Sequence, residues 1–125
     1  VLFTSAAETL GALRSAGALT AGMPAEVLLL VPLIVPFPLS LEEPPTPMSF
    51  VCRRIGELLR GLPDGVSVEA CVLPCRNPAE TILNVLKPRS LVLIGARRHD
   101  LFARPWRLAR KLRRAGHEVL IAGPA

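Results

Sequence analysis

The sequence predicts an α/β fold: a single-domain, three-layer α/β/α sandwich whose five-stranded parallel sheet is doubly wound, with strand order 3-2-1-4-5. Two observations support this prediction. Short apolar segments typical of buried strands alternate along the chain with segments of helical periodicity, which is the pattern of βαβ units. The chain also has 125 residues, 50% of them hydrophobic, so we expect one core and one domain over residues 1–125.

The first two strands and the helix between them are predicted from the start of the chain. Val1–Phe3 looks like the end of a strand, and Ser5 and Glu8 have the spacing of a capping box that opens a helix. Residues 26–31 are strongly apolar and are expected to form the second strand. Six prolines follow over 32–47, so we expect this connection to be stiff and non-helical.

A second helix and an edge strand are expected next. Apolar residues recur at helical spacing over 48–62, and turn residues follow at Pro63. The residues of this apolar face are Met48, Val51, Ile55, Leu58, Leu59 and Leu62. Residues 66–73 alternate between two sets of side chains, one of them largely polar, which favours a strand at the edge of the sheet.

The following helix and strand form the clearest part of a βαβ unit. Asn77 can cap the helix, Pro78 occupies a position that needs no amide hydrogen, and Glu80 stands at the third helical position. The apolar strand 91–94 follows and is succeeded by Gly95. In open parallel sheets, ligands bind beyond the carboxyl ends of the strands, so the loop after Gly95 is the first candidate site.

The last helix is predicted over 103–115 and the last strand over 118–122. An apolar stripe of the helix can pack on the sheet: Trp106, Ala109, Leu112 and Ala115, with Leu108 beside it. Basic residues recur on another face, at Arg104, Arg107, Lys111 and Arg114. The simplest interpretation is a solvated face, and the alternative is a docking surface for an acidic protein or nucleic acid. With no Tyr and one Trp, stacking on bases is disfavoured, so nucleic acid is not the expected partner.

The distribution of charge favours an anionic partner. Residues 1–88 carry six Lys or Arg against eight Asp or Glu, whereas residues 89–125 carry nine against two. A basic C-terminal third is typical of surfaces that meet phosphate, nucleic acid or acidic protein.

Composition also limits the compartment and the chemistry. The longest apolar stretch, 27–39, is too short to span a bilayer and contains three prolines, and the start of the chain lacks the pattern of a secretory signal. We therefore expect no membrane insertion and a cytoplasmic location. Cys52, Cys71 and Cys75 lack the partners of a zinc site, so we expect reduced structural thiols, with a redox switch between Cys71 and Cys75 as the alternative.

The order of these elements resembles the universal stress protein family, which has a small α/β fold of the adenine-nucleotide-binding type. The resemblance covers nearly the whole chain and depends most on the segments 77–83, 91–95 and 119–121. Members that bind ATP carry a motif of glycine, two residues, glycine, nine residues, then glycine and serine or threonine. Only Gly95 matches, because Arg98 and Leu108-Ala109 occupy the later positions.

The family also places an acidic residue after the first strand, near the adenine. Thr4 and Ser5 stand at that place here, and the first carboxylate of the chain is Glu8. Glycine lets backbone amides converge on phosphate, and arginine and leucine do not, although arginine can bind phosphate through its side chain. We therefore name Gly95, Arg97, Arg98 and His99 as candidates for binding a nucleotide or another anion.

These observations predict a non-enzymatic, universal-stress-protein-like regulatory module in which ATP binding is weakened or lost. No catalytic triad, paired buried carboxylates or metal cluster is evident, so we expect no catalytic residues, no metal and no required cofactor, with ATP as the possible exception. The alternatives are a binding protein for ATP or another phosphorylated ligand, and a basic adaptor. The resemblance also implies a homodimer, for which the edge of the last strand, 119–122, offers a route by strand pairing.

Overall fold

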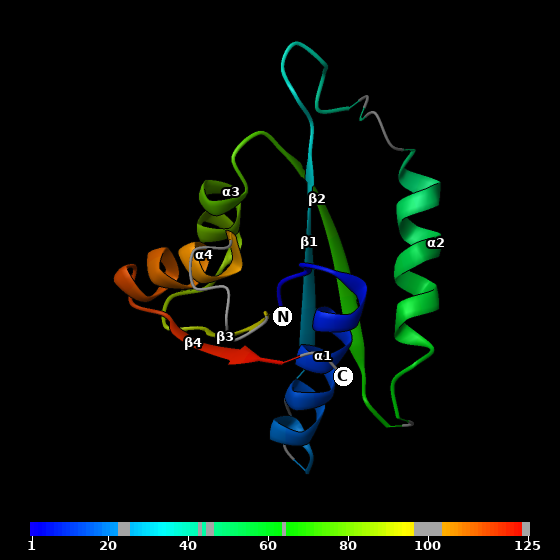
Figure 1. Ribbon diagram of the computed structural model, residues 1–125, viewed down its shortest axis with the longest axis vertical. Helices are drawn as coiled ribbons and strands as arrows, with labels where there is room; N and C mark the ends of the chain where they lie inside the picture. Colours follow the sequence, from blue (N-terminus) through cyan, green and yellow to red (C-terminus); the bar gives the residue numbers. More distant parts are fainter. Residues whose placement is uncertain (23–25, 43, 45–46, 64, 97–103, 124–125) are drawn as a thin grey trace.

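The computed structural model describes residues 1–22, 26–42, 44, 47–63, 65–96 and 104–123 (Figure 1). Helices and strands alternate through them, as the sequence predicts. The elements in chain order are α1 (Ala6–Thr20), β1 (Val27–Ile34), α2 (Met48–Leu59), β2 (Val68–Cys75), α3 (Pro78–Val85), β3 (Leu91–Gly95), α4 (Arg104–Arg114) and β4 (Glu118–Ala122). The α/β class is therefore confirmed.

The four strands form two parallel pairs. β1 pairs with β2 from Val27 opposite Val68, and β3 pairs with β4 from Leu91 opposite Glu118. The expected first strand is reduced to Leu2, which makes isolated parallel bridges to Leu30 of β1 and to Ile94 of β3. The structure thus has two small parallel sheets in place of the predicted five-stranded sheet, with one bridging residue between them.

Two apolar clusters lie on opposite faces of the strands. Helices α3 and α4 cover one face, and α1 and α2 cover the other (Figure 1). The first cluster contains Leu2, Leu30, Ile82, Val92, Ile94, Ala109, Leu112 and Val119. The second contains Ala12, Leu13, Ala16, Val27, Leu29, Val31, Ile55 and Leu93. Because successive side chains of a strand point to opposite faces, β1 and β3 each contribute to both clusters, as strands covered on both faces must.

Local caps fix where two of the helices begin. The Ser5 side chain accepts a hydrogen bond from the backbone N–H of Glu8 at the start of α1. The Asn77 side chain accepts one from the backbone N–H of Glu80, and Pro78 is the first residue of α3. Both caps were predicted from the sequence and are confirmed. No helix in the described segments is both long and apolar enough to cross a membrane.

Two prolines lie inside strands, which corrects the predicted strand ends. The sequence places the end of the second strand before Pro32, yet β1 continues to Ile34, and β2 runs through Pro74 to Cys75. Leu30 exchanges backbone hydrogen bonds with Val1 and Phe3, on the side of β1 away from β2. Every second residue of a parallel strand faces the same neighbour, so the nitrogen of Pro32 also points away from β2. The nitrogen of Pro74 likewise faces away from β1. A missing N–H is tolerated at such positions.

The cysteines of β2 lie on one extended strand. Cys71 and Cys75 are four residues apart within β2, which separates their Cα atoms by about 13 Å, and a disulfide needs less than about 7 Å. All three cysteines are free. The geometry therefore supports reduced thiols and not a switch between Cys71 and Cys75.

We expect a thiol reagent to modify Cys52 of the folded protein rapidly and Cys75 slowly. Cys52 is exposed, whereas Cys75 is buried. Burial raises the pKa of the Cys75 thiol, which a hydrogen bond with the Thr81 side chain partly offsets, so little thiolate is available to react. Mass spectrometry of peptides after timed alkylation measures both rates, and unfolding in urea should make them equal. Equal rates in the folded protein would contradict the buried placement of Cys75.

Candidate functional site

The candidate site lies where the carboxyl end of β3 meets the start of α1. Gly95 is the last residue of β3, and a Cβ atom added to it would overlap the carbonyl oxygen and carbon of Glu8 in α1. Such a close approach of two backbones is possible only without a side chain. The glycine predicted to open a ligand loop therefore has a packing role at the α1–β3 contact.

The polar groups around Gly95 are bonded to one another. The Thr4 hydroxyl lies 2.8 Å from the carbonyl oxygen of Gly95 and 3.4 Å from Oε2 of Glu8, so it donates more strongly to Gly95. The Thr4 backbone N–H donates to the hydroxyl of Thr9, which is fully buried. The backbone N–H of Ala96, one residue beyond β3, donates to the carbonyl oxygen of Ala122 at 2.9 Å.

These contacts place a carboxylate at the candidate site. Glu8 is partly exposed, and its side chain lies within reach of the Thr4 hydroxyl, next to Gly95. Glu8 is the first carboxylate of the chain, and no local pattern of residues places it beside Gly95. One pattern in the sequence could have located Glu8. If the strand that ends at Phe3 lies beside the strand that ends at Gly95, the capping box of Ser5 and Glu8 lies at the same edge of the sheet as Gly95.

The structure places only part of the predicted anion site. Gly95 lies at the end of β3, whereas Arg97, Arg98 and His99 lie outside the described residues. Among the residues that are described, no group of three His, Cys, Asp or Glu side chains is arranged to hold a metal ion.

The second histidine has a structural position away from Gly95. His117 is 8% exposed, and its Nδ1 accepts a hydrogen bond of 3.1 Å from the backbone N–H of Ser90. This bond joins the turns that precede β3 and β4, at the amino ends of both strands. His117 is therefore separated from the carboxyl end of β3 by the length of that strand.

The basic face of α4 is exposed along the part of the helix that is described. Arg107, Lys111 and Arg114 are all exposed, while the Arg104 side chain lies outside the described part. The opposite stripe packs inward, since Ala109 and Leu112 are fully buried. Ala115, which the sequence places on that stripe, is exposed because α4 ends at Arg114 and the chain turns away. Three cations in the last turn also suit the negative end of the helix dipole.

One arginine of α4 covers the outer edge of β4. Nη2 of Arg113 donates to the carbonyl oxygen of Val119 at 2.9 Å. The Glu118 N–H donates to Ser90 and the Ala122 carbonyl accepts from Ala96, so the backbone groups of Glu118 and Ala122 face β3. Because successive residues of a strand face opposite neighbours, the backbone groups of Val119 point to the outer edge. The edge predicted for dimer formation thus has one of its acceptors bonded within the chain.

No family model, curated protein or solved structure matches the chain. The resemblance to universal stress proteins therefore stays a prediction from the sequence.

Proposed function

We propose that this protein is a universal-stress-protein-like regulatory module, without catalysis of its own, in which ATP binding is weakened or lost. The order of the paired segments supports the family. Leu2 bridges β1 and β3, so the neighbours run β2, β1, Leu2, β3, β4, which is the succession that the order 3-2-1-4-5 would give if Leu2 belonged to a full first strand. The free thiols suit a reducing compartment such as the cytoplasm.

The observation that carries the weakened ATP site is the contact of Gly95 with Glu8. A phosphate turn needs backbone N–H groups that are open to the ligand and free of nearby negative charge. Here α1 lies against Gly95, the Ala96 N–H is bonded to Ala122, and the Glu8 carboxylate lies 3.4 Å from the Thr4 hydroxyl. A triphosphate at this end of β3 would find the Ala96 N–H already bonded to Ala122.

Calorimetry with ATP and magnesium tests this proposal. We expect no binding tighter than a Kd of about 100 μM, which corresponds to roughly 5.5 kcal/mol. The protein as purified should also release no nucleotide on denaturation, as followed by chromatography. Binding tighter than that limit, abolished by Arg98→Glu, would favour the alternative of a binding protein for phosphorylated ligands.

The connection between β1 and α2 supports a role in protein contacts. Several large apolar side chains are exposed in or beside it: Ile34, Phe37, Leu39, Leu41, Met48 and Phe50. In Figure 1 this connection projects beyond the helices. The Arg76 guanidinium donates to the carbonyl oxygens of Val35 and Leu39 at 3.3 and 2.9 Å and lies 5.6 Å from the centre of the Phe37 ring. Clustered exposed apolar side chains mark interaction surfaces in other proteins.

A basic adaptor is the second candidate, favoured by the exposed Arg107, Lys111 and Arg114. The partner of such a face is an acidic protein rather than nucleic acid, because the chain offers few aromatic side chains for stacking. Filter binding of DNA or RNA over a salt series separates the two partners. Binding that weakens steeply as salt is raised would identify nucleic acid as the partner. If the filter retains no nucleic acid even at low salt, nucleic acid is excluded as the partner.

We also propose a homodimer that pairs through β4. The Arg113→Ala variant should dimerise more tightly than the wild type, because the carbonyl of Val119 becomes available for strand pairing. Sedimentation equilibrium measures both constants, with Arg114→Ala as the control that removes the same charge from an exposed position. If all three proteins remain monomeric, β4 is not the dimer edge.

A further inference from the structure

One buried histidine joins the two turns that lie at the amino ends of β3 and β4. Nδ1 of His117 accepts a hydrogen bond of 3.1 Å from the backbone N–H of Ser90, and the ring is buried. The carbonyl oxygen of Ser90 accepts a second bond of 3.1 Å, from the backbone N–H of Glu118. Both backbone groups of Ser90 are therefore held by the segment that leads from α4 into β4.

The end of α4 fixes the backbone that carries the ring. Gly116 has a φ of 96°, and its N–H donates to the carbonyl oxygen of Arg113. The His117 N–H donates to the carbonyl oxygen of Leu112 at 3.2 Å. These are the two bonds of a Schellman cap, in which glycine adopts the left-handed conformation. The backbone of His117 is thus anchored independently of the bond between its ring and Ser90.

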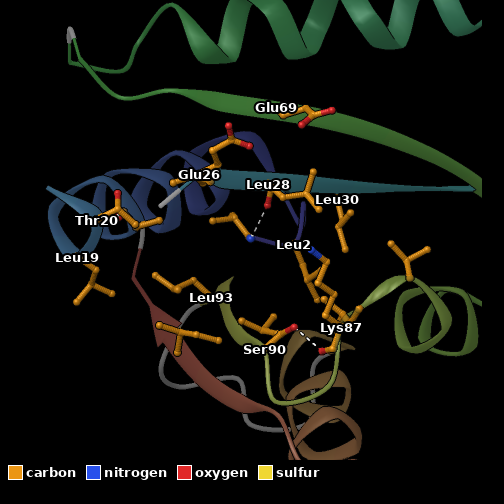
Figure 2. Close-up of a pocket in the computed structure, with 17 residues that line it drawn as sticks. Leu2, Leu19, Thr20, Glu26, Leu28, Leu30, Glu69, Lys87, Ser90 and Leu93 are labelled. Carbon is orange, nitrogen blue, oxygen red and sulfur yellow. Dashed lines mark hydrogen bonds between the residues drawn. The ribbon is translucent and has the colours of Figure 1, made fainter. Parts of the chain in front are cut away.

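The turn before β3 depends more on its hydrogen bonds. Figure 2 shows the Ser90 side chain bonded to the carbonyl oxygen of Lys87 across this turn. Between them, Arg89 has a φ of 57°, a left-handed conformation that costs energy for any residue other than glycine. A bond that holds Ser90 in place also helps to hold this strained turn.

The bond between His117 and Ser90 requires a neutral ring. A neutral imidazole has one N–H and one bare nitrogen, and here the bare nitrogen is Nδ1, because it accepts the bond. A proton taken from solvent by Nδ1 turns this atom into a donor, and a donor cannot bond to the Ser90 N–H. The proton and Ser90 therefore compete for the same lone pair.

Most charged side chains near the ring or flanking Ser90 are positive. His117 borders a hollow of about 410 Å³, to which α1 and β3 contribute the apolar Leu19 and Leu91. The charged residues that border this hollow, end α4 or flank Ser90 are Glu118, Arg113, Lys111, Arg114, Lys87 and Arg89. Once its bond to Ser90 is lost, a cationic ring is repelled by more of these groups than attract it, which favours its rotation toward solvent.

We propose that His117 is a pH-sensitive latch between the turns that precede β3 and β4. The neutral ring holds Ser90, and protonation of Nδ1 releases the Ser90 N–H to water. The amino ends of the two strands then loosen, while their carboxyl ends stay joined by the bond from Ala96 to Ala122. Because histidine is the side chain that ordinarily changes charge near neutral pH, mild acidification operates the latch.

Amide hydrogen exchange of the full chain at about pH 7.5 and about pH 5.5 tests the latch. The quantity compared is the protection factor, in which the intrinsic effect of pH on exchange is removed. We expect the protection factor of the Ser90 N–H to fall about fivefold or more at the lower pH, which corresponds to the loss of one neutral hydrogen bond. The Ala96 N–H, at the other end of β3, should keep its protection factor. No fall at Ser90 would overturn the proposal.

His117→Asn is the matched variant. The asparagine oxygen lies close to the position of Nδ1, so it can accept the same bond, but it does not titrate. Ser90 should then have the same protection factor at both pH values. Burial lowers the pKa of the Val1 amino group to about 6, and this group titrates in both proteins, so a difference between them belongs to His117. An equal fall in both proteins would contradict the latch.

Nuclear magnetic resonance of the wild type gives a test that needs no variant. At about pH 7.5 the ring nitrogens should show Nδ1 without a proton. As the pH is lowered, the Ser90 amide signal should shift with the same midpoint as the ring of His117. A proton on Nδ1 at the higher pH, or two different midpoints, would also overturn the proposal.

Discussion

The Gly95→Ala variant is expected to lower the free energy of unfolding by about 3 kcal/mol or more. The added methyl group would overlap the backbone of Glu8, and a helix backbone cannot move aside as the end of a flexible side chain can. α1 would have to shift away from β3, which also weakens the bond from Thr4 to the Gly95 carbonyl. Urea unfolding followed by circular dichroism measures the change.

Gly56→Ala is the matched control. It adds the same methyl group within α2, where nothing lies within 4 Å of the new atom. Alanine is the better helix former, so this variant should gain about 0.5–1 kcal/mol. If the free energy of unfolding of Gly95→Ala is no lower than that of Gly56→Ala, α1 does not rest against β3 as described.

The Leu2→Ala variant is expected to lose about 3 kcal/mol of stability through a cavity in the core. Leu2 is 1% exposed and belongs to the cluster covered by α3 and α4. Its backbone bond to Leu93 and the bonds of Val1 and Phe3 to Leu30 remain possible in the variant, so the loss measures the side chain alone. Denaturant unfolding measures the difference in free energy of unfolding between wild type and variant, provided that its dependence on denaturant concentration is the same for both proteins.

Leu41→Ala is the control for Leu2. Leu41 is 41% exposed in the connection that follows β1, and its truncation should change stability by less than about 0.5 kcal/mol. If Leu2→Ala and Leu41→Ala unfold at the same denaturant concentration, Leu2 does not join the two strand pairs through the core.

The helices were predictable because their limits depend on neighbouring residues. Ser5 and Asn77 cap helices three residues before the amides that they bond, so a short stretch of sequence holds the whole interaction. Strand limits depend on the partner strand. Pro32 was expected to end a strand, but the side to which its nitrogen points follows from pairing with β2, which no local pattern contains.

The candidate site was predictable only in its location. Gly95 marks the carboxyl end of a parallel strand, and that position follows from the βαβ pattern. The contacts that define its chemistry join distant parts of the chain, since Thr4 and Gly95 are 91 residues apart. A glycine in a sequence does not distinguish a turn that binds phosphate from a place where two backbones touch, and here the nearby backbone of Glu8 makes that distinction.

The two hydrogen bonds from Arg76 have a thermodynamic consequence for any protein that recognises the connection after β1. They hold Val35 and Leu39 on either side of Phe37, so this exposed ring is presented on a restrained backbone before a partner arrives. Binding of a partner then costs less backbone conformational entropy than it would if this connection were an unrestrained loop. An Arg76→Ala protein should accordingly bind such a partner more weakly, although Phe37 itself is unchanged.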